Sequence, residues 1–261
     1  MADNDSILIK TAVILPCYNE AERLKVGEFT SFIGGCAGVD FIFVNDGSSD
    51  GTSALLHDIC SREPARFYCI DLARNSGKAE AVRQGFLKGF AMGYDLLGFW
   101  DADLATPLYE IPLFRDEMCA QKVQIVIGSR VKLLGRSIRR SEARHYLGRI
   151  FATCASLVLK LPVYDTQCGA KLFRNGAALR RVFAVPFTTR WTFDVEILAR
   201  FLVLSRHEPG LSLEAITVEH PLREWYDVPG SKVKWHDFVK SAKDLVKIYL
   251  YLRREGRSAA W

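Results

Sequence analysis

Short apolar runs alternate with longer amphipathic stretches through the first half of the chain. The runs TAVILP, DFIFVND, ARFYCIDL, YDLLGFWD and VQIVIGSR are rich in β-branched and aromatic residues and predict strands. Residues 20–34, 51–62, 77–92 and 108–120, which lie between or beside them, predict helices. This alternation is typical of βαβ units and predicts an α/β fold with a mainly parallel sheet flanked by helices. A ligand crevice is expected at the C-terminal ends of the strands.

The alternation ends after residue 130. Residues 137–161 predict one long helix, basic at its start and apolar in its second half. A compact segment, DTQCGAKLF, follows, then a helix from Trp191 to Ser205 and a strand near 211–220. Residues 233–254 predict an amphipathic helix rich in lysine and arginine. The apolar faces of both basic helices suit either packing on the core or contact with a membrane surface.

Neither an internal repeat nor a linker divides the chain into independent domains. We therefore expect a short N-terminal tail at 1–9, one α/β domain at 10–232, and a basic amphipathic helix and tail at 233–261. A hydrophobic content of 49% with 25% charged residues predicts an ordinary globular core. The net charge of +5 is too small to indicate nucleic-acid binding, although basic residues gather at 130–149 and 232–254, which favours anionic lipid or phosphate.

Cysteine usage and hydropathy indicate the compartment. The seven cysteines are scattered without a Cys-x-x-Cys pair, which favours reduced thiols and argues against a disulfide framework or a zinc site. The first residues, MADNDS, lack the apolar core of a signal peptide. No uncharged apolar run approaches the roughly 20 residues that span a bilayer. We expect a cytoplasmic protein, peripheral at a membrane surface.

An acidic pair, Asp101 and Asp103, directly follows the apolar run that predicts the fourth strand. Carboxylates at i and i+2 beyond a strand end suit a hard divalent cation, because Mg²⁺ is usually held by one or two carboxylates and a substrate phosphate. Alone the pair is a weak signal, since short acidic pairs also cap helices and solvate loops.

Three other polar segments follow predicted strands. Pro16-Cys17-Tyr18-Asn19-Glu20 opens a helix, and Tyr18 suits a nucleobase contact, although a capped strand-to-helix turn is an equal alternative. Asp46, at a buried strand end, is placed to accept a hydrogen bond from a base N–H. The string RNSGK ending at Lys78 lacks Walker spacing, which excludes an ATPase of that type, but a helix N-terminus there suits a nucleotide.

The order and spacing of these segments resemble the family-2 glycosyltransferases with a GT-A, Rossmann-like fold. The later strings GSR (128–130), DTQCGAKLF (165–173), RWTFDVEIL (190–198) and PGSK (229–232) look most like the dolichyl-phosphate glucosyltransferase branch of the polyprenyl-phosphate sugar transferases. Two positions depart from the mannose branch. Position 105 is Ala where a polar residue is often found, and position 226 is Tyr where an arginine is usual, so that branch is disfavoured.

The resemblance implies a role for each matching residue. Asp194 would occupy the place of the general base or orient the acceptor phosphate, although a helix residue paired with Arg190 or Arg200 is an equal alternative. Asp165 and Gln167 would shape the sugar pocket or cap a turn. The implied set is catalytic Asp194, Lys232 and Arg130; donor-binding Pro16, Tyr18, Glu20, Val44, Asp46, Lys78, Asp101 and Ala102; metal-binding Asp101 and Asp103; and acceptor-phosphate-binding Arg139, Arg140, Arg144, Lys171 and Lys232.

The implied reaction moves a hexose, glucose from UDP-glucose, to dolichyl or polyprenyl phosphate with inversion and with Mg²⁺ or Mn²⁺ as cofactor. Its partners would be the nucleotide sugar, the lipid phosphate and a membrane surface, with no nucleic acid. The alternatives are a transferase of the same fold that uses a soluble acceptor or GDP-mannose, and an inactive nucleotide-sugar-binding protein at a membrane surface.

Overall fold

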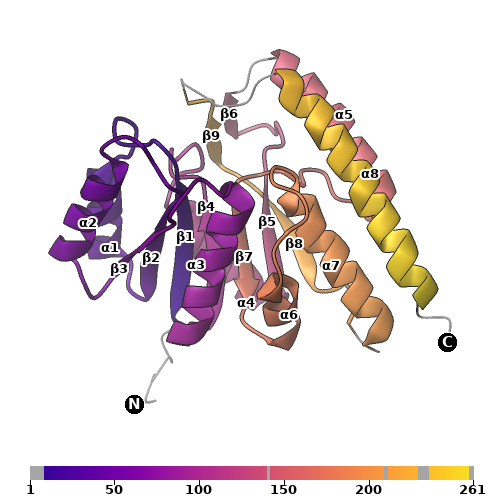
Figure 1. Cartoon of the computed structure of the whole chain (residues 1–261), viewed down its shortest axis with the longest axis horizontal. Helices are drawn as coiled ribbons and strands as arrows, with labels where there is room; N and C mark the ends of the chain where they lie inside the picture. Colours follow the sequence, from indigo (N-terminus) through magenta and orange to yellow (C-terminus); the bar gives the residue numbers. More distant parts are fainter. Residues whose placement is uncertain (1–8, 140–141, 209–210, 229–234, 259–261) are drawn as a thin grey trace.

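The structure is a computed structural model that describes residues 9–139, 142–208, 211–228 and 235–258. Side chains are described for 9–139, 146–208, 211–228 and 240–255. In Figure 1 a central sheet stands between two layers of helices, so the predicted α/β class is confirmed.

The central sheet has seven strands. It is mainly parallel, as predicted. One strand, β7, runs antiparallel to both of its neighbours, β4 and β5. In spatial order the sheet consists of β3 (Phe67–Asp71), β2 (Val39–Asn45), β1 (Thr11–Cys17), β4 (Leu96–Trp100), β7 (Ala170–Arg174), β5 (Ile125–Ser129) and β8 (Thr217–Pro221).

Helices cover both faces of the sheet and form two separate apolar cores. Their buried residues, such as Phe29 of the first helix and Phe86 of the third, meet alternate side chains of the strands. One face carries α1 (Val26–Gly35), α2 (Thr52–Arg62) and α4 (Glu110–Ala120), and the other carries α3 (Lys78–Met92), α5 (Glu142–Leu159), α6 (Ala177–Ala184), α7 (Phe193–His207) and α8 (Trp235–Ser258).

Helix α3 lies close against the sheet because its inner face includes glycine. A Cβ atom at Gly85 would come within 2.4 Å of Ile14 Cγ2 in β1, so no larger residue fits there without a shift. This close approach fixes the height of α3 over the strands. It therefore also fixes the position of Lys78, the first residue of the helix.

Several element boundaries differ from the sequence prediction. The first helix begins at Val26 and not at residue 20, because the backbone N–H of Glu20 is bound by the Thr52 hydroxyl and turns precede the helix. Residues 137–139 are not helical: they form strand β6 (Ser137–Arg139), which pairs in parallel with β9 (Glu224–Tyr226). Strand β7 lies inside the compact segment 165–173, and neither β9 nor α6 was predicted.

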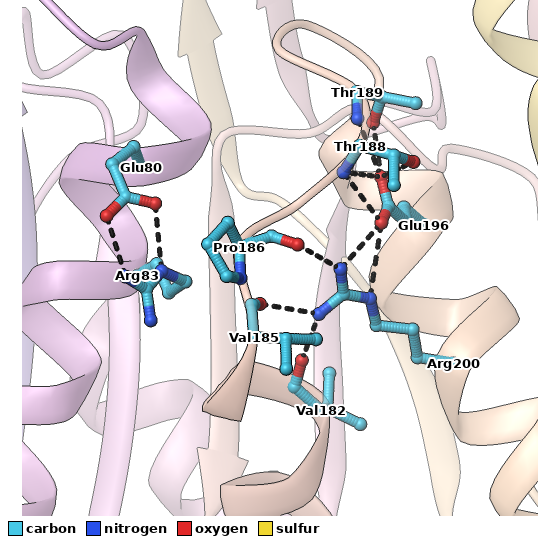
Figure 2. Close-up of polar contacts among 9 residues, drawn as sticks. All are labelled: Glu80, Arg83, Val182, Val185, Pro186, Thr188, Thr189, Glu196 and Arg200. Atoms are coloured by element: carbon cyan, nitrogen blue, oxygen red, sulfur yellow. Dashed lines mark hydrogen bonds and ion pairs between the residues drawn. The ribbon is translucent and has the colours of Figure 1, made fainter.

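A buried ion pair fastens the middle of α7 to the chain that precedes it (Figure 2). Arg200 donates to Glu196 and to the carbonyl oxygens of Val182, Val185 and Pro186. Glu196 in turn accepts from the backbone N–H groups and hydroxyls of residues 188 and 189. The segment 182–190 is therefore fixed to α7 by side-chain hydrogen bonds and not by regular secondary structure.

Helices α5 and α8 pack beside each other and beside α7 at one edge of the molecule. Each has an apolar inner face, which confirms the core-packing alternative for both helices. Each also has exposed apolar residues. No helix in the described part of the chain is long and apolar enough to cross a membrane. The inner residues are Ala152, Ala155, Leu159, Leu245, Ile248 and Leu252, and the exposed ones are Tyr146, Ile150, Leu157, Val246, Tyr249 and Leu250.

Candidate functional site

Asp101 lies immediately beyond the C-terminal end of β4, in contact with a lysine and a glycine. Its Oδ1 accepts a hydrogen bond from Lys78 Nζ at 2.5 Å. A Cβ atom at Gly169 would come within 1.8 Å of Asp101 Oδ2, so only glycine leaves room for the carboxylate there. The backbone leading into β7 therefore forms one wall around Asp101. Nothing in the local sequence predicts this contact between distant segments.

Asp103 is the second carboxylate of the acidic pair. Its Oδ2 accepts from Arg23 Nη2 at 3.0 Å and its Oδ1 accepts from the backbone N–H of Ala105 at 3.1 Å. Burial and the negative charge of Asp101 raise the pKa of Asp103, against the opposing effect of these donors. The pair is thus two mutually repelling carboxylates at one strand end.

That arrangement fits a divalent cation. Carboxylate oxygens are the ligands that Mg²⁺ and Mn²⁺ prefer, and a metal held by two carboxylates leaves further positions for substrate phosphate. A cation between Asp101 and Asp103 would also offset the repulsion that raises the pKa of Asp103. The two predicted metal ligands therefore form a chemically suitable site, and their role stays a prediction.

Lys78 is the first residue of α3, and three carboxylates act on its charge. Burial opposes its charge, but the carboxylates of Asp101, Asp194 and Asp103 together raise the pKa of Lys78. Its Nζ also lies 6.0 Å from the centroid of the Phe193 ring. The structure thus brings three predicted functional acids around one predicted donor-binding cation.

Asp46 organises the loop that precedes Lys78. Its two carboxylate oxygens accept from the backbone N–H groups of Ser76 and Gly77, at 2.7 and 2.8 Å. Burial raises the pKa of Asp46 in spite of these bonds. We predicted that this side chain accepts a hydrogen bond from a base. In the structure it holds the loop beside it, and its hydrogen bond to a base stays a prediction.

Asp194 lies in the first turn of α7 and pairs with Lys171 of β7. Lys171 Nζ donates to Asp194 Oδ1 at 2.5 Å and to the Cys168 carbonyl oxygen at 2.7 Å. The lysine is only 1% exposed, so its ammonium group is bound inside the protein and is not presented to a ligand at the surface. The alternative pairing of Asp194 with Arg190 or Arg200 was wrong: Arg190 contacts Asn75, and Arg200 binds Glu196.

Arg130 follows β5 and forms a bidentate pair with Asp165. Its Nε and Nη2 donate to the two carboxylate oxygens at 2.7 and 2.8 Å, and its guanidinium lies 5.4 Å from the Trp225 ring centroid. Asp165 is further fixed because its own backbone N–H is bound by Glu219 at 2.8 Å. Arg130 is therefore rigidly positioned, and the residue that positions it is one predicted for the sugar pocket.

The remaining predicted donor-binding residues lie around the same edge of the sheet. Tyr18 is partly exposed, with 36% of its surface accessible, and suits the predicted contact with a base. Val44 is fully buried in a strand and packs in the core. The others, Pro16, Glu20 and Ala102, are half-buried or buried beside the first and fourth strands.

Only part of the predicted acceptor site lies within the described residues. Arg139 of β6 stacks on Tyr226, with its guanidinium 5.6 Å from the ring centroid. Arg140 and Lys232 lie outside the described residues, as does the side chain of Arg144. A cleft of about 840 Å³ beside β6 and β9 contains two arginines that the sequence analysis missed. It is lined by Tyr109, Gly135, Arg136, Ser137, Arg223 and Glu224.

Strand β9, which borders this cleft, also contacts the loop of the acidic pair. The backbone N–H of Tyr226 in β9 donates to the carbonyl oxygen of Ala105, two residues after Asp103. The end of β9 and the loop after Asp103 are therefore joined by a backbone hydrogen bond.

The sequence is similar to known proteins along most of its length. The family model described as "Glycosyl transferase family 2" matches residues 12–180. A dolichyl-phosphate beta-glucosyltransferase of Saccharomyces cerevisiae is 33% identical, over 94% of this chain and 75% of the yeast protein. A protein of the same name from Homo sapiens is 30% identical, over 98% of this chain and 79% of the human protein.

Solved structures share the fold. A glucosyl-3-phosphoglycerate synthase of Mycobacterium tuberculosis, solved with Mn²⁺, UDP and glucosyl-3-phosphoglycerate, superposes with a TM-score of 0.60 at 17% identity. The same enzyme with Mn²⁺, UDP-glucose and phosphoglyceric acid gives a TM-score of 0.61 at 14% identity. In both cases the alignment covers 93% of this chain and 79% of the other.

Proposed function

This chain belongs to glycosyl transferase family 2, and we propose that it is a hexosyltransferase that moves glucose from UDP-glucose to dolichyl phosphate. The observation that carries the proposal is the convergence of Asp101, Asp103, Lys78 and Asp194 at the C-terminal edge of the sheet. The choice of glucose and of dolichyl phosphate follows the names of relatives at about 30% identity, which are dolichyl-phosphate beta-glucosyltransferases.

The leaving group dictates what this site must do. Transfer of a hexose with inversion leaves negative charge on the nucleoside diphosphate as the anomeric centre becomes oxocarbenium-like. Mg²⁺ or Mn²⁺ held by Asp101 and Asp103 would supply Lewis-acid neutralisation of that charge. Lys78, fixed on Asp101, adds a permanent positive charge, while Asp46 holds the loop before Lys78 in place.

The acceptor needs cations more than it needs a base. A phosphate monoester has a second pKa of about 6, so it is already largely ionised at neutral pH. Arginine forks suit the binding of such a group. We assign this task to Arg139, with Arg136 and Arg223 of the adjoining cleft as additions to the predicted set. Asp194 then acts by holding Lys171 and by its charge near Lys78, and not as an obligatory proton acceptor.

The exposed faces of α5 and α8 suit the water-insoluble acceptor. Exposed Tyr146, Ile150 and Leu157 on α5, and Val246 and Tyr249 on α8, present apolar surface at the edge of the molecule. Exposed Lys243, Lys247, Arg253 and Arg254 on α8 would contact anionic headgroups. We propose that these two helices hold the protein at a membrane surface.

The function is tested by a donor panel with a short dolichyl phosphate in Mn²⁺ and in Mg²⁺, followed by mass spectrometry of the organic phase. We expect a prenyl-phosphate hexose from UDP-glucose and at least tenfold less from GDP-mannose. Product from GDP-mannose alone would contradict the assignment of UDP-glucose as the donor. Hexose found in a defined aqueous product would contradict the assignment of a lipid acceptor. Donor binding without turnover would favour an inactive binding protein.

Acidification is expected to weaken Mn²⁺ binding. A proton competes with the metal for Asp103, and because the pKa of Asp103 is raised, this competition begins at a higher pH than for an ordinary aspartate with a pKa of about 3.9. The apparent Kd for Mn²⁺ in the presence of UDP should rise as the pH falls from neutral towards about 4. Calorimetry measures how the apparent Kd for Mn²⁺ changes with pH. The Asp103→Asn variant in the same buffers shows the part of this change that comes from titration of UDP. Equal slopes in the two proteins would contradict the assignment.

A further inference from the structure

A cluster of metal-binding side chains lies away from the acidic pair, where α2 packs on the edge strand β3. His57 comes from the helix, and Cys69 and Asp71 come from the strand. One ligand atom from each lies within 4.8 Å of the other two. Because the strand residues are at i and i+2, both side chains point to the same face of the sheet, towards α2.

Cys60 lies beside this cluster and contacts it through Cys69. It lies three residues after His57, so both side chains occupy one face of α2. Its thiol shares a hydrogen bond with the thiol of Cys69, so the two sulfur atoms lie next to each other.

Asp71 is held so that one oxygen faces the cluster. Its Oδ1 accepts from Asn45 Nδ2 at 2.7 Å and from Ser53 Oγ at 2.9 Å. Its Oδ2 contacts His57 Nε2 at 2.6 Å. Hydrogen bonds that fix the outer oxygen of a carboxylate while the inner one binds are the usual support of a protein metal ligand.

We propose that His57, Cys60, Cys69 and Asp71 form a second metal site, which binds Zn²⁺. Two thiolates, an imidazole and a carboxylate are a tetrahedral zinc donor set, softer than the all-oxygen pair at Asp101 and Asp103. Nitrogen and oxygen ligands about 2.0 Å from zinc lie roughly 3.3 Å apart, so His57 must withdraw slightly from Asp71. Its side chain is 61% exposed and free to do so.

The absence of a Cys-x-x-Cys pair had argued against zinc, but the four ligands come in two pairs from two elements. A helix supplies one pair and a neighbouring strand the other. Sequence spacing therefore carries little information about such a site, and only the packing of α2 on β3 brings the pairs together.

The proposed zinc site is linked to the loop beside the donor-binding residues. Asn45, which donates to Asp71, accepts through its Oδ1 from the backbone N–H of Ser48 at 3.1 Å. Ser48 Oγ accepts in turn from the backbone N–H of Asn19 at 3.0 Å. Zinc would thus fix the loop after β2 through Asp71 and Asn45, without touching the transferred sugar.

The test is metal binding by the full chain after treatment with a chelator. Zn²⁺ is titrated against a chromophoric chelator, and Co²⁺ is used to detect thiolate-to-metal charge transfer. We expect one tight equivalent of Zn²⁺, and at least tenfold weaker binding in Cys69→Ser and in His57→Gln, since even loss of a supporting residue around a metal costs about 10–100-fold. His57 is exposed, so His57→Gln should fold if Cys69→Ser does not.

Two control variants separate this site from other metal ligands. Cys119→Ser removes an exposed thiol elsewhere, and Asp101→Asn disables the acidic pair; both should retain the zinc affinity and the cobalt band. The proposal is overturned if His57→Gln binds Zn²⁺ as tightly as the parent. It is equally overturned if the cobalt band persists in Cys69→Ser, or if the tight equivalent disappears in Asp101→Asn.

Discussion

Replacing Asp101 with asparagine is expected to lower kcat/KM for glucosyl transfer by at least about 10²–10³-fold, the range found when one preorganised electrostatic group is lost. The amide keeps the shape that fits against Gly169 but removes the charge that binds a metal and pairs with Lys78. The loss should appear mainly in kcat, because the diphosphate charge develops in the transition state. Initial rates of organic-phase product measure it.

The matched control is Asp116→Asn, which removes an exposed carboxylate on α4 and should leave the rate unchanged. Thermal unfolding of both variants separates a catalytic loss from a folding defect. An Asp101→Asn protein within tenfold of the parent rate would refute the proposed metal site.

Replacing Arg200 with methionine is expected to lower the free energy of unfolding by about 3–5 kcal/mol, the usual cost of removing one partner from a buried ion pair. The Arg200 and Glu196 side chains are only 9% and 4% exposed. Methionine keeps much of the volume but removes the arginine donors to Glu196 and to three carbonyl oxygens drawn in Figure 2, so the buried Glu196 charge keeps only the donors of residues 188 and 189. Urea denaturation followed by circular dichroism measures the change.

Figure 2 also contains the control, the bidentate pair of Arg83 with Glu80 in α3. Glu80 is 25% exposed, so water can solvate it once the arginine is gone. Loss of this ion pair in Arg83→Met should therefore lower the free energy of unfolding by no more than about 1 kcal/mol. If Arg200→Met destabilises the protein no more than Arg83→Met does, the segment 182–190 is not anchored in the way described.

The central strands could be predicted because their burial is visible in local sequence. Strands β1 and β4 are buried on both faces, so TAVILPC and LLGFW contain almost nothing but apolar residues. Parallel strands end at one edge of the sheet, so the polar residues after them could be grouped before their contacts were known. Asp101, Asp103, Lys78 and Asp46 do lie along this edge.

The contacts that distant segments make there could not be predicted. Strand β7 contains Lys171, an unexpected residue for a buried strand, and its charge is explained only by Asp194 on a later helix. The wall that Gly169 forms beside Asp101 likewise depends on pairing between β4 and β7. Local sequence encodes propensity, whereas these partners are determined by tertiary packing.

The antiparallel position of β7 has a consequence for the order in which the protein folds. Among the described strands, β5 does not pair with β4; it is connected to β4 only through β7, which is made more than forty residues later. A growing chain that ends after β5 therefore has β4 as an open edge, with a row of unpaired backbone groups. Closing that edge needs contacts between residues far apart in sequence, which form slowly. Until β7 is synthesised and inserted, the nascent chain is most exposed to misassembly at β4.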